Sequence, residues 1–366
     1  MTDTILHVGK VAGISGSEAH LLTLLPGLRE RGWDARFCLL HEGESGAAEF
    51  SERLAGAGVP VEQVRLARDV DPLALSRLLG IVRHLRPRLL HTHLVHADAY
   101  GLPAGKLARV PVLVSTKHGF NPFRESRAFA LGDRTIGRLV DVHVAISRGL
   151  AKYLAETEGF DEAQFEIVHY GIAAGPEPPP LPPAEPRLLC VGRLVPIKGH
   201  ETLLRAFAEA RRSLPELTLE VVGDGPLRAE LEERTRDLDL SDAVVFAGRV
   251  APVAPAYEHA AIVVVPSLGE GFGMVALEAA ERGRPVVASA VGGLPEIVDD
   301  GRTGMLVPPA DAGALARTLV ELAGDPARGA AMGLAGRARA LREFSLDRCA
   351  DRIDALYRSG LARRGR

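Results

Sequence analysis

The sequence predicts an α/β protein of two domains, each a parallel sheet covered by helices. Short β-branched and apolar runs recur along the chain, and amphipathic or Ala/Glu-rich segments separate them, which is the pattern of alternating strands and helices. Glycine-rich turns follow several of the apolar runs, and one proline-dense segment lies near the middle, at residues 175–186. We therefore expect two domains of nearly equal size joined by that segment.

The composition is that of an ordinary α/β protein. The chain has 366 residues, enough for two full hydrophobic cores. A formal net charge of −3 without a long basic run argues against nucleic acid as the main partner. The three cysteines lack CxxC spacing, which indicates buried thiols in a reducing compartment. The sequence shows neither a signal-peptide pattern nor an apolar run of membrane-spanning length, so we expect a cytoplasmic protein.

The first domain is expected to open with a strand over residues 4–9, a glycine-containing loop and an amphipathic helix over 18–31. This unit can approach a phosphate closely. It lacks the GxGxxG and Walker patterns, so a tight turn between strand and helix explains it equally well. Further strands of this domain are expected at residues 35–40, 89–93, 112–117, 142–146 and 166–169.

Histidines lie at the ends of two of these strands. His91 and His93 share one face of a short strand and His96 follows, as metal ligands can. Because no cysteine or carboxylate cluster stands beside them, we expect hydrogen-bonded histidines at a strand end rather than a metal site. His118 lies in the loop after the strand at 112–117, where a structural and a functional role are equally consistent with its position.

Segment 120–148 mixes aromatic and aliphatic residues with several arginines. Such a mixture suits an anionic membrane surface or a lipid-linked acceptor. Glu125, Asp133 and Asp141 dilute its positive charge. We therefore expect a solvated helix face and keep peripheral contact with the inner face of the membrane as the alternative.

Residues 175–186 read GPEPPPLPPAEP. No helix or central strand tolerates that proline density, so we expect a stiff, extended linker. The second domain then opens with a strand ending near Val191, followed by a loop that carries Arg193 and Lys198. Two cations in one loop above a sheet can neutralise a diphosphate, although two solvated charges would give the same pattern.

The next units of the second domain repeat the strand-and-turn pattern. A strand over 217–222 leads into the turn Gly223-Asp224-Gly225-Pro226, and another strand lies at 244–248. The Gly-x-Gly of this turn is only a weak indication of a dinucleotide site, because a third glycine and a closing acidic residue are both absent.

The most informative stretch is residues 266–278, PSLGEGFGMVALE, which joins the apolar run 260–265 to a segment of good helix formers. Open α/β sheets place ligands at such turns. Its glycines let the backbone approach a ligand, and the helix that begins near Gly273 directs free N–H groups at an anion. Glu270 and Glu278 flank those donors and suit hydroxyl groups. An acidic helix start with glycines for a tight turn is the alternative.

The rest of the chain completes the second sheet. We expect a strand at 285–290, glycine turns at 292–293 and 301–304, and last helices at 314–322 and 347–358. Gly292 and Gly293 can also admit a nucleotide.

Together these motifs resemble the retaining glycosyltransferases of family 4. The resemblance rests on the Glu-x7-Glu pattern with Gly-Phe-Gly after its first glutamate, on Gly-Arg-x4-Lys-Gly at 192–199 and on GDGPLRAELE, and it is sharpest in residues 187–308. Gly16 and His118 match the pattern as well. Ser15 replaces a family glycine, and His169-Tyr170-Gly171-Ile172 occupies the place where the family often has Asn-Gly.

The resemblance implies the GT-B fold, in which two Rossmann-like domains face each other across a cleft. It implies an acceptor-side domain at 1–174, the proline-rich linker at 175–186, a nucleotide-sugar donor domain at 187–345, and a C-terminal helix at 346–366 that crosses back to the first domain.

The resemblance also implies roles for individual residues. Glu270 would hold sugar hydroxyls, Glu278 the ribose, and Arg193 and Lys198 the diphosphate. The implied catalytic set is His118, Arg193, Lys198 and Glu270, and the implied donor-binding set is Gly16, Gly225, Gly271, Phe272, Gly273, Met274 and Glu278.

The implied activity is transfer of a hexose from a UDP-, GDP- or ADP-linked sugar to a sugar or lipid-linked acceptor in cell-envelope or exopolysaccharide assembly. No metal is expected, and the Asp-x-Asp triplets at 69–71 and 237–239 are expected at the surface. Two alternatives remain open. A nucleotide-sugar 2-epimerase would form an epimer without an acceptor, and a non-catalytic nucleotide-sugar binding protein would turn nothing over.

Overall fold

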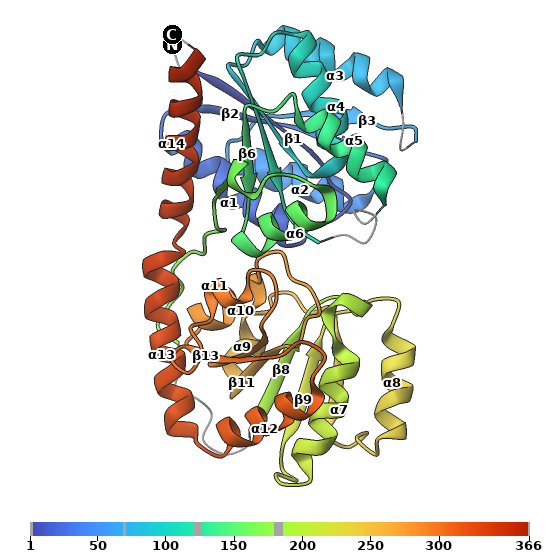
Figure 1. The fold of residues 1–366 in the computed structure, drawn as a ribbon, viewed down its shortest axis with the longest axis vertical. Helices are drawn as coiled ribbons and strands as arrows, with labels where there is room; N and C mark the ends of the chain where they lie inside the picture. The colour runs from blue at the N-terminus through green and yellow to red at the C-terminus, as the bar shows by residue number, and fades with distance from the viewer. Residues whose placement is uncertain (1–2, 69–70, 121–125, 179–185, 365–366) are drawn as a thin grey trace. The chain divides into compact units, whose positions relative to one another are not determined.

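The structure is a computed structural model that describes residues 3–68, 71–120, 126–178 and 186–364. Parts of four predicted features lie outside these residues: positions 69 and 70 of one Asp-x-Asp triplet, 121–125 of segment 120–148, 179–185 of the proline-rich segment, and the final two residues. The chain forms two compact units (Figure 1). Unit 1 comprises Met1–Gly171 and Leu346–Arg366, and unit 2 comprises Ile172–Ser345.

Unit 1 is built on a seven-stranded sheet in the order β3-β2-β1-β4-β5-β6-β7, in which every neighbouring pair is parallel. Parallel neighbours require crossover connections, which the intervening helices supply. The strands are β1 (Thr4–Lys10), β2 (Asp34–His41), β3 (Val61–Arg65), β4 (Leu89–His93), β5 (Val112–Lys117), β6 (Val142–Ala145) and β7 (Phe165–Ile167).

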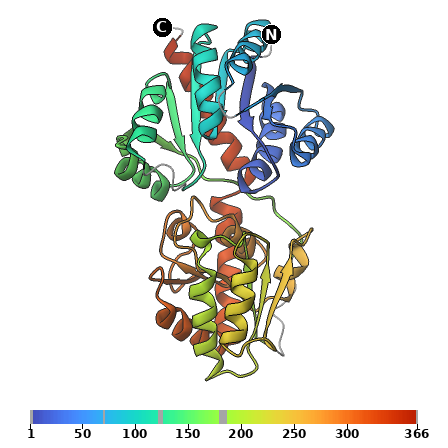
Figure 2. The ribbon, with the colours of Figure 1, turned by 90° about the vertical axis from the view of Figure 1, so that its right-hand side faces the viewer.

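Helices cover both faces of this sheet. One apolar cluster joins the sheet to α1, α2 and α14, and a second joins the opposite face to α3 and α4. Helix α14, drawn in red, lies against the blue and green elements of unit 1 in Figure 2. The helices are α1 (Gly16–Glu30), α2 (Ser45–Gly56), α3 (Pro72–Leu85), α4 (Leu94–Leu107), α5 (Arg127–Gly137), α6 (Arg148–Glu158), the 3-10 helix η2 (Glu162–Gln164) and α14 (Leu346–Arg364).

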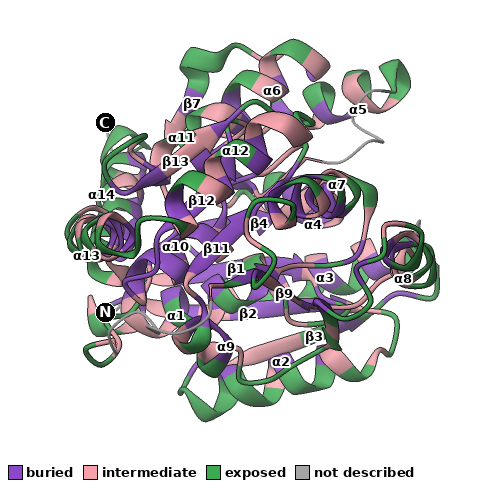
Figure 3. Ribbon diagram, turned by 90° about the horizontal axis from the view of Figure 1, so that it is seen from below, coloured by how far each residue is buried: buried purple, intermediate pink, exposed green. Residues whose placement is uncertain are grey.

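Unit 2 is built on a six-stranded parallel sheet in the order β10-β9-β8-β11-β12-β13. The strands of both sheets are largely buried (Figure 3), as parallel sheets covered on two faces must be. The strands are β8 (Arg187–Val191), β9 (Thr218–Val222), β10 (Val244–Gly248), β11 (Ile262–Val265), β12 (Val286–Ser289) and β13 (Gly304–Val307).

The helices of unit 2 also cover both faces of their sheet. Helices α7 and α12 pack on one face, and α10 and α13 pack together and hold the other. The helices are η3 (Pro196–Lys198), α7 (His200–Arg211), α8 (Arg228–Asp237), α9 (Ala254–His259), α10 (Met274–Glu281), α11 (Leu294–Ile297), α12 (Ala312–Ala323) and α13 (Pro326–Glu343).

The predicted fold class, two parallel α/β sheets with alternating helices, is confirmed. The predicted burial of the thiols is confirmed too, because Cys38, Cys190 and Cys349 are free and buried, and burial raises the pKa of each to about 12. In the described part of the chain, no helix combines the length and the apolar character that crossing a bilayer requires.

Three expectations were incomplete or wrong. Strand β3 (Val61–Arg65), at the edge of the unit 1 sheet, was missing from the predicted strands. Helix α13 was missed, although Asp325 caps its first turn and Pro326 opens it, a recognisable start signal. Asp71 was expected at the surface but is 5% exposed. Its carboxylate caps α3 by accepting hydrogen bonds from the backbone N–H groups of Leu73 and Ala74, so it is a structural cap.

Candidate functional site

Three loops at the carboxyl end of the unit 2 sheet are joined by backbone hydrogen bonds. The loop after β8 (192–199) meets the loop after β9 (223–227), because Leu194 N–H donates to Asp224 O at 3.0 Å. It also meets the loop after β11 (266–273), whose Leu268 N–H donates to Ile197 O at 2.8 Å. The three loops that carry most of the predicted donor-site residues therefore form one hydrogen-bonded layer.

Glycine is required where these loops touch. A Cβ on Gly225 would lie 2.5 Å from Leu194 O. Gly292, in the loop after β12, has φ +54°, and a Cβ there would lie 1.7 Å from Glu270 O. Neither contact leaves room for a side chain. The neighbouring Gly293 N–H donates to Glu270 O at 3.2 Å, so this glycine pair holds the Glu270 loop in place.

Lys198 and Glu270, 72 positions apart in sequence, form an ion pair. Lys198 Nζ donates to Glu270 Oε2 at 2.6 Å, and Ser267 Oγ donates to the same oxygen at 3.2 Å. Their side chains are 24% and 15% exposed, so both groups can be reached from outside. A lysine ammonium has three donor hydrogens and a carboxylate has two oxygens. The pair thus keeps capacity for further hydrogen bonds.

Arg193 lies in the same layer and is exposed. It forms no ion pair with any described residue, whereas most arginines of unit 2 do. A guanidinium presents five N–H donors in a planar fork that matches phosphate oxygens. Arg193 is therefore placed to bind an external anion.

Helix α10 begins beside this ion pair. Its N-cap is Gly273, with φ +111°, and its first residue is Met274. The first N–H groups of a helix have no partner inside the helix and carry its positive dipole end. The side chain of Phe272 is 2% exposed and packs edge-on against Phe344, 5.8 Å between ring centroids. The buried phenyl ring of Phe272 thus anchors the loop that leads into α10.

Glu278 lies on α10 and is largely buried. Its Oε2 accepts a hydrogen bond from the Tyr257 hydroxyl at 2.7 Å. Burial raises the pKa of Glu278, while the Tyr257 hydroxyl and Arg282 partly oppose that rise. Tyr257, itself 2% exposed, thus orients one carboxylate oxygen and leaves the other for a ligand hydroxyl.

In unit 1, the predicted residues are Gly16 and His118. Gly16 is the first residue of α1, and its neighbour Ser15 forms the N-cap with the Glu18 carboxylate, which accepts from Ser15 N–H at 3.1 Å. His118 follows β5, and its imidazole is held from both nitrogens. Nε2 is 2.9 Å from His93 Nδ1, and Nδ1 is hydrogen-bonded to the Tyr170 hydroxyl.

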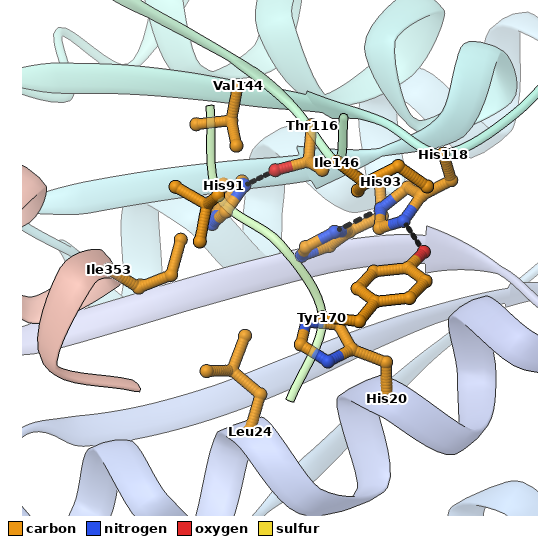
Figure 4. Close-up of a pocket in the computed structure, with 11 residues that line it drawn as sticks. His20, Leu24, His91, His93, Thr116, His118, Val144, Ile146, Tyr170 and Ile353 are labelled. Carbon is orange, nitrogen blue, oxygen red and sulfur yellow. Dashed lines mark hydrogen bonds between the residues drawn. The ribbon is translucent and has the colours of Figure 1, made fainter. Parts of the chain in front are cut away.

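His118 belongs to a group with His7 on β1 and with His91 and His93 on β4 (Figure 4 labels the last two and His118). His7, His91 and His93 are buried, and His118 is half-buried. His7 Nδ1 lies 2.9 Å from His93 Nε2, and His7 Nε2 lies 3.3 Å from the hydroxyl of Tyr357 on α14. His91 joins that hydroxyl through Nδ1 at 2.5 Å and Thr116 Oγ1 through Nε2 at 2.6 Å. This arrangement fits the expectation of hydrogen-bonded histidines at a strand end.

Burial keeps these imidazoles neutral near pH 7. It lowers the pKa of His7 and His20 to about 3, and, together with the charges of His20 and Lys117, that of His118 to about 3. The pKa values of His91 and His93 fall well below the ordinary value for the same reason, burial first and neighbouring histidines second.

His7, His91 and His93 each place one ring nitrogen within 4.8 Å of the other two, a spacing that could accommodate a metal ion. Each of these rings already uses its nitrogens in the hydrogen bonds above. A cavity of about 10 Å³ opens beside them, lined also by His20 and Tyr170. That volume is about the size of one water molecule.

Lys117 fixes the end of β5 next to His118. Its ammonium, 2% exposed, donates to Asp98 Oδ2 and Asp133 Oδ2, both at 2.8 Å. Ser115 and Thr92 donate to the other oxygen of Asp98. A buried charge needs this degree of pairing. The network ties α4 and α5 to β5, and its members are distant in sequence, so the pattern alone did not indicate it.

The structure thus divides the predicted residues between the units. Arg193, Gly225 and the predicted residues from Lys198 through Glu278 lie in unit 2, and Gly16 and His118 lie in unit 1. Sequence reasoning missed Ser267 and Tyr257, which orient the two glutamates, and the hydrogen-bond partners of His118. The one sequence signal for these partners was that Tyr170 stands in the segment that departs from the family pattern.

Family models match both units. One, described as "Glycosyl transferases group 1", covers residues 185–325, and one described as "Glycosyl transferase 4-like domain" covers residues 15–171. Together they span most of the two units.

Two curated relatives illustrate the similarity. A GDP-mannose-dependent alpha-(1-6)-phosphatidylinositol monomannoside mannosyltransferase of Mycolicibacterium smegmatis is 33% identical over 326 residues, which are 81% of this chain and 83% of that protein. A D-inositol 3-phosphate glycosyltransferase of Catenulispora acidiphila is 36% identical over 273 residues, 66% of this chain and 63% of that protein. The second alignment therefore leaves over a third of the relative unmatched.

Solved structures share the fold along the whole chain. Anabaena HepE in complex with UDP and glucose superimposes with a TM-score of 0.85 at 21% identity, covering 98% of this chain and 100% of that one. A sucrose-phosphate synthase of Thermosynechococcus elongatus gives 0.81 at 25% identity, covering 98% and 100%.

Proposed function

The chain belongs to the glycosyltransferases of the family 4 type, with the GT-B fold, and on this premise we propose that unit 2 binds a nucleotide-diphosphate-sugar through Arg193, Lys198, Glu270 and Glu278. The observation that carries the proposal is the 2.6 Å contact between Lys198 and Glu270. It brings the cationic loop and the Glu-x7-Glu stretch into one site.

The diphosphate is assigned to the cationic side of this site. Arg193 can bind phosphate oxygens with two parallel N–H groups, and Lys198 keeps donor hydrogens beyond the one it gives to Glu270. The N-terminus of α10, at Gly273 and Met274, adds backbone N–H groups and a positive dipole end. Negative charge grows on the diphosphate as the sugar leaves, so these donors stabilise the transition state more than the ground state.

The hydroxyl groups of the donor are assigned to the two glutamates. Glu270 Oε2 is held by Lys198 and Ser267, which leaves Oε1 for sugar hydroxyls. Glu278 Oε2 is held by Tyr257, which leaves Oε1 for the ribose. Carboxylates accept hydrogen bonds from hydroxyls and repel phosphates. Their charge therefore assigns the hydroxyl groups to the glutamates and the diphosphate to the cations.

We propose transfer with retention of the anomeric configuration and without a protein nucleophile. The leaving diphosphate oxygen accepts the proton of the incoming hydroxyl, and the neutral imidazole of His118 is the catalytic group that we propose for unit 1. No metal is assigned a role, because Arg193, Lys198 and the α10 terminus supply the positive charge that a metal ion supplies elsewhere.

The relatives guide the choice of substrates to test. One is named for GDP-mannose and a phosphatidylinositol mannoside, another for inositol 3-phosphate, and a structural neighbour contains UDP. We propose a hexosyl donor linked to GDP or UDP and a polyol or lipid-linked acceptor, in cell-envelope or exopolysaccharide assembly at the cytoplasmic side of the membrane. Helix α5, with Leu131 61% exposed beside exposed arginines, is the proposed peripheral contact.

The test is a donor panel with product analysis. Purified protein is incubated with UDP-, GDP- and ADP-sugars, with and without inositol phosphates, phosphatidylinositol mannosides and polyprenyl phosphosugars, and nucleoside diphosphate release is measured with and without EDTA. We expect release from one donor, enhanced by one acceptor and unaffected by EDTA.

Two variants test the site. Arg193→Ala and Glu270→Ala should each lower turnover about 100-fold or more with an unchanged fold, as loss of one transition-state donor does. Arg205→Ala, at an exposed position in the middle of α7, is the control. Near-normal rates in either site variant would refute the assignment, an epimer formed without release would establish the epimerase, and binding without any turnover would leave a binding protein.

A further inference from the structure

Six hydrogen bonds connect seven groups of unit 1 in a single line. In order, the groups are Thr116, His91, Tyr357, His7, His93, His118 and Tyr170. All eight ring nitrogens of the four histidines take part. We call this set the histidine chain.

The hydrogen count of the histidine chain restricts its direction. A neutral imidazole has one N–H and one bare nitrogen, and a hydroxyl has one hydrogen. The Tyr357 hydroxyl is fully buried between His91 and His7, and an unbonded buried hydrogen costs free energy, so it donates to one of these rings. The five inner groups then supply five hydrogens for six bonds, and the sixth comes from one of the two ends, Thr116 or Tyr170. Once one end donates, every bond points the same way along the chain. All four imidazoles then carry their hydrogen on the same kind of nitrogen, either all on Nδ1 or all on Nε2.

Strand register holds the middle of the chain. His7 lies opposite His91 across the β1–β4 pair, and His93 lies opposite Thr116 across the β4–β5 pair. These positions are 0 to 5% exposed, so water does not compete for the ring nitrogens. Buried and mutually satisfied polar networks rigidify their members.

The two ends of the chain differ in setting. Tyr170 immediately precedes the boundary of unit 1, is 4% exposed, and stacks on His20 of α1 with ring centroids 4.2 Å apart. It belongs to the His169–Ile172 segment that departs from the family pattern. Its hydroxyl is hydrogen-bonded to His118 Nδ1, so Tyr170 restricts rotation of the His118 ring.

We propose that Tyr170 and His93 are positioning residues that clamp His118 from its two nitrogens, and that the histidine chain fixes which nitrogen carries the hydrogen. The functional part of this inference rests on the proposed role of His118 in transfer. The structural part is that the histidine chain, which reaches α14, imposes one tautomer on its members. This part does not depend on the role of His118 in transfer.

The experiment measures tautomers directly. The protein is labelled with ¹⁵N-histidine, and long-range ¹H–¹⁵N spectra assign Nδ1–H or Nε2–H for each ring. We expect one shared tautomer for His7, His91, His93 and His118 at pH 7.5. Tyr170→Phe keeps the ring on His20 and removes only the hydroxyl, and it should give His118 mixed tautomers. Thr116→Val tests the opposite end.

Activity is read in the same variants. Tyr170→Phe should lower kcat about tenfold with donor KM nearly unchanged, because it loosens the orientation of His118 and leaves unit 2 intact. Tyr100→Phe is the matched control, since its buried hydroxyl accepts a hydrogen bond from the backbone N–H of Asp71 and is no member of the histidine chain, so its loss should change neither readout.

The results of these experiments test the tautomer clamp and the role of His118 in transfer separately. A His118 tautomer that stays single in Tyr170→Phe, or different tautomers along the wild-type chain, overturns the clamp whatever the activity. A normal rate in His118→Gln overturns the role of His118 in transfer and leaves the tautomer result standing. One equivalent of zinc in the purified protein, lost in His7→Gln, would overturn the histidine chain itself, since metal-bound nitrogens cannot share hydrogens.

Discussion

The two units have the same strand order and place their polar groups in opposite ways. The order β3-β2-β1-β4-β5-β6 in unit 1 corresponds to β10-β9-β8-β11-β12-β13 in unit 2. In unit 2 the functional groups are charged, lie in loops beyond the strand ends and remain partly exposed, as Lys198 and Glu270 do. In unit 1 they are neutral imidazoles, three of them buried on β1 and β4, with the half-buried His118 directly after β5. Charges for an anionic ligand must stay near water, whereas neutral rings can be buried once each nitrogen has a partner.

The largest expected effect is a difference in acid stability between the units. Burial lowers the pKa of His7, His20 and His118 to about 3, and those of His91 and His93 also fall well below 6.5. Below pH 6.5 these histidines bind protons in the unfolded chain but stay neutral in the folded protein. Acid therefore favours unfolding. The free energy of unfolding of unit 1 should therefore fall as the pH is lowered from 6.5 toward 3.

We expect unit 2 to lose less stability than unit 1 over this pH range. Among its described histidines only His200 shows such a shift, to about 4, and burial raises the pKa of Glu278, which acts in the opposite direction. Hydrogen exchange at pH 7 and pH 5, corrected for intrinsic rates, should show protection lost first in unit 1. Equal loss in both units would contradict the comparison.

The second prediction concerns the charge in the unit 2 loops. Lys198→Met removes one cation from the proposed diphosphate site and should lower kcat/KM about 100-fold. Lys152→Met, at an exposed lysine of α6, is the matched control and should stay within about twofold, as exposed ion pairs contribute little. If both variants behaved alike in a donor-release assay, Lys198 would be no more than a surface charge.

The third prediction compares two glycines of unit 2 with similar backbone conformations. Gly292 and Gly301 have φ +54° and +74°, so alanine strains both. Only at Gly292 does the new Cβ meet an atom, Glu270 O at 1.7 Å, while Gly301 faces open space. Gly292→Ala should destabilise the protein by about 2 kcal/mol more than Gly301→Ala in urea unfolding and weaken donor binding. Equal destabilisation by the two substitutions would mean that the Glu270 loop shifts without cost to accommodate the Cβ at position 292.

The smallest effect is expected at Tyr257. Tyr257→Phe removes the hydroxyl that orients Glu278 and helps keep its pKa from rising further. The free energy of one such hydrogen bond is about 1 kcal/mol, so donor KM should rise about threefold to tenfold with kcat little changed. Initial-rate kinetics against donor concentration measure this. An unchanged donor KM would contradict the assignment of Glu278 to the donor site.

The fold was accessible from the sequence because its signals are local. Apolar runs such as Ile262–Val265 mark strands, and the glycines at 271 and 273 mark the turn into α10. The donor-side residues were accessible for the same reason, since each sits in a short loop of distinctive composition. Their pairing was not, because the contact of Lys198 with Glu270 depends on how two loops 72 positions apart fold over β8 and β11.

The histidine chain could not be predicted, because its members are spread from position 7 to position 357. Period-two alternation placed His91 and His93 on one face. Only the strand order puts β1 beside β4 and so His7 beside His91. Tyr357 enters from a helix at the other end of the chain. Long-range register of this kind has no short sequence pattern.

Helix α14 has a consequence for how the protein is made. Unit 1 is discontinuous, and its core contains Cys349, Ile353 and Tyr357, the last of which is 0% exposed. During synthesis the first 171 residues emerge with that apolar face uncovered and with His7 and His91 lacking their shared hydroxyl, until all of unit 2 has been translated. Unit 2, being continuous, can complete its core first. We expect unit 1 to be the later unit to mature on the ribosome, and the one that relies on chaperones while it waits.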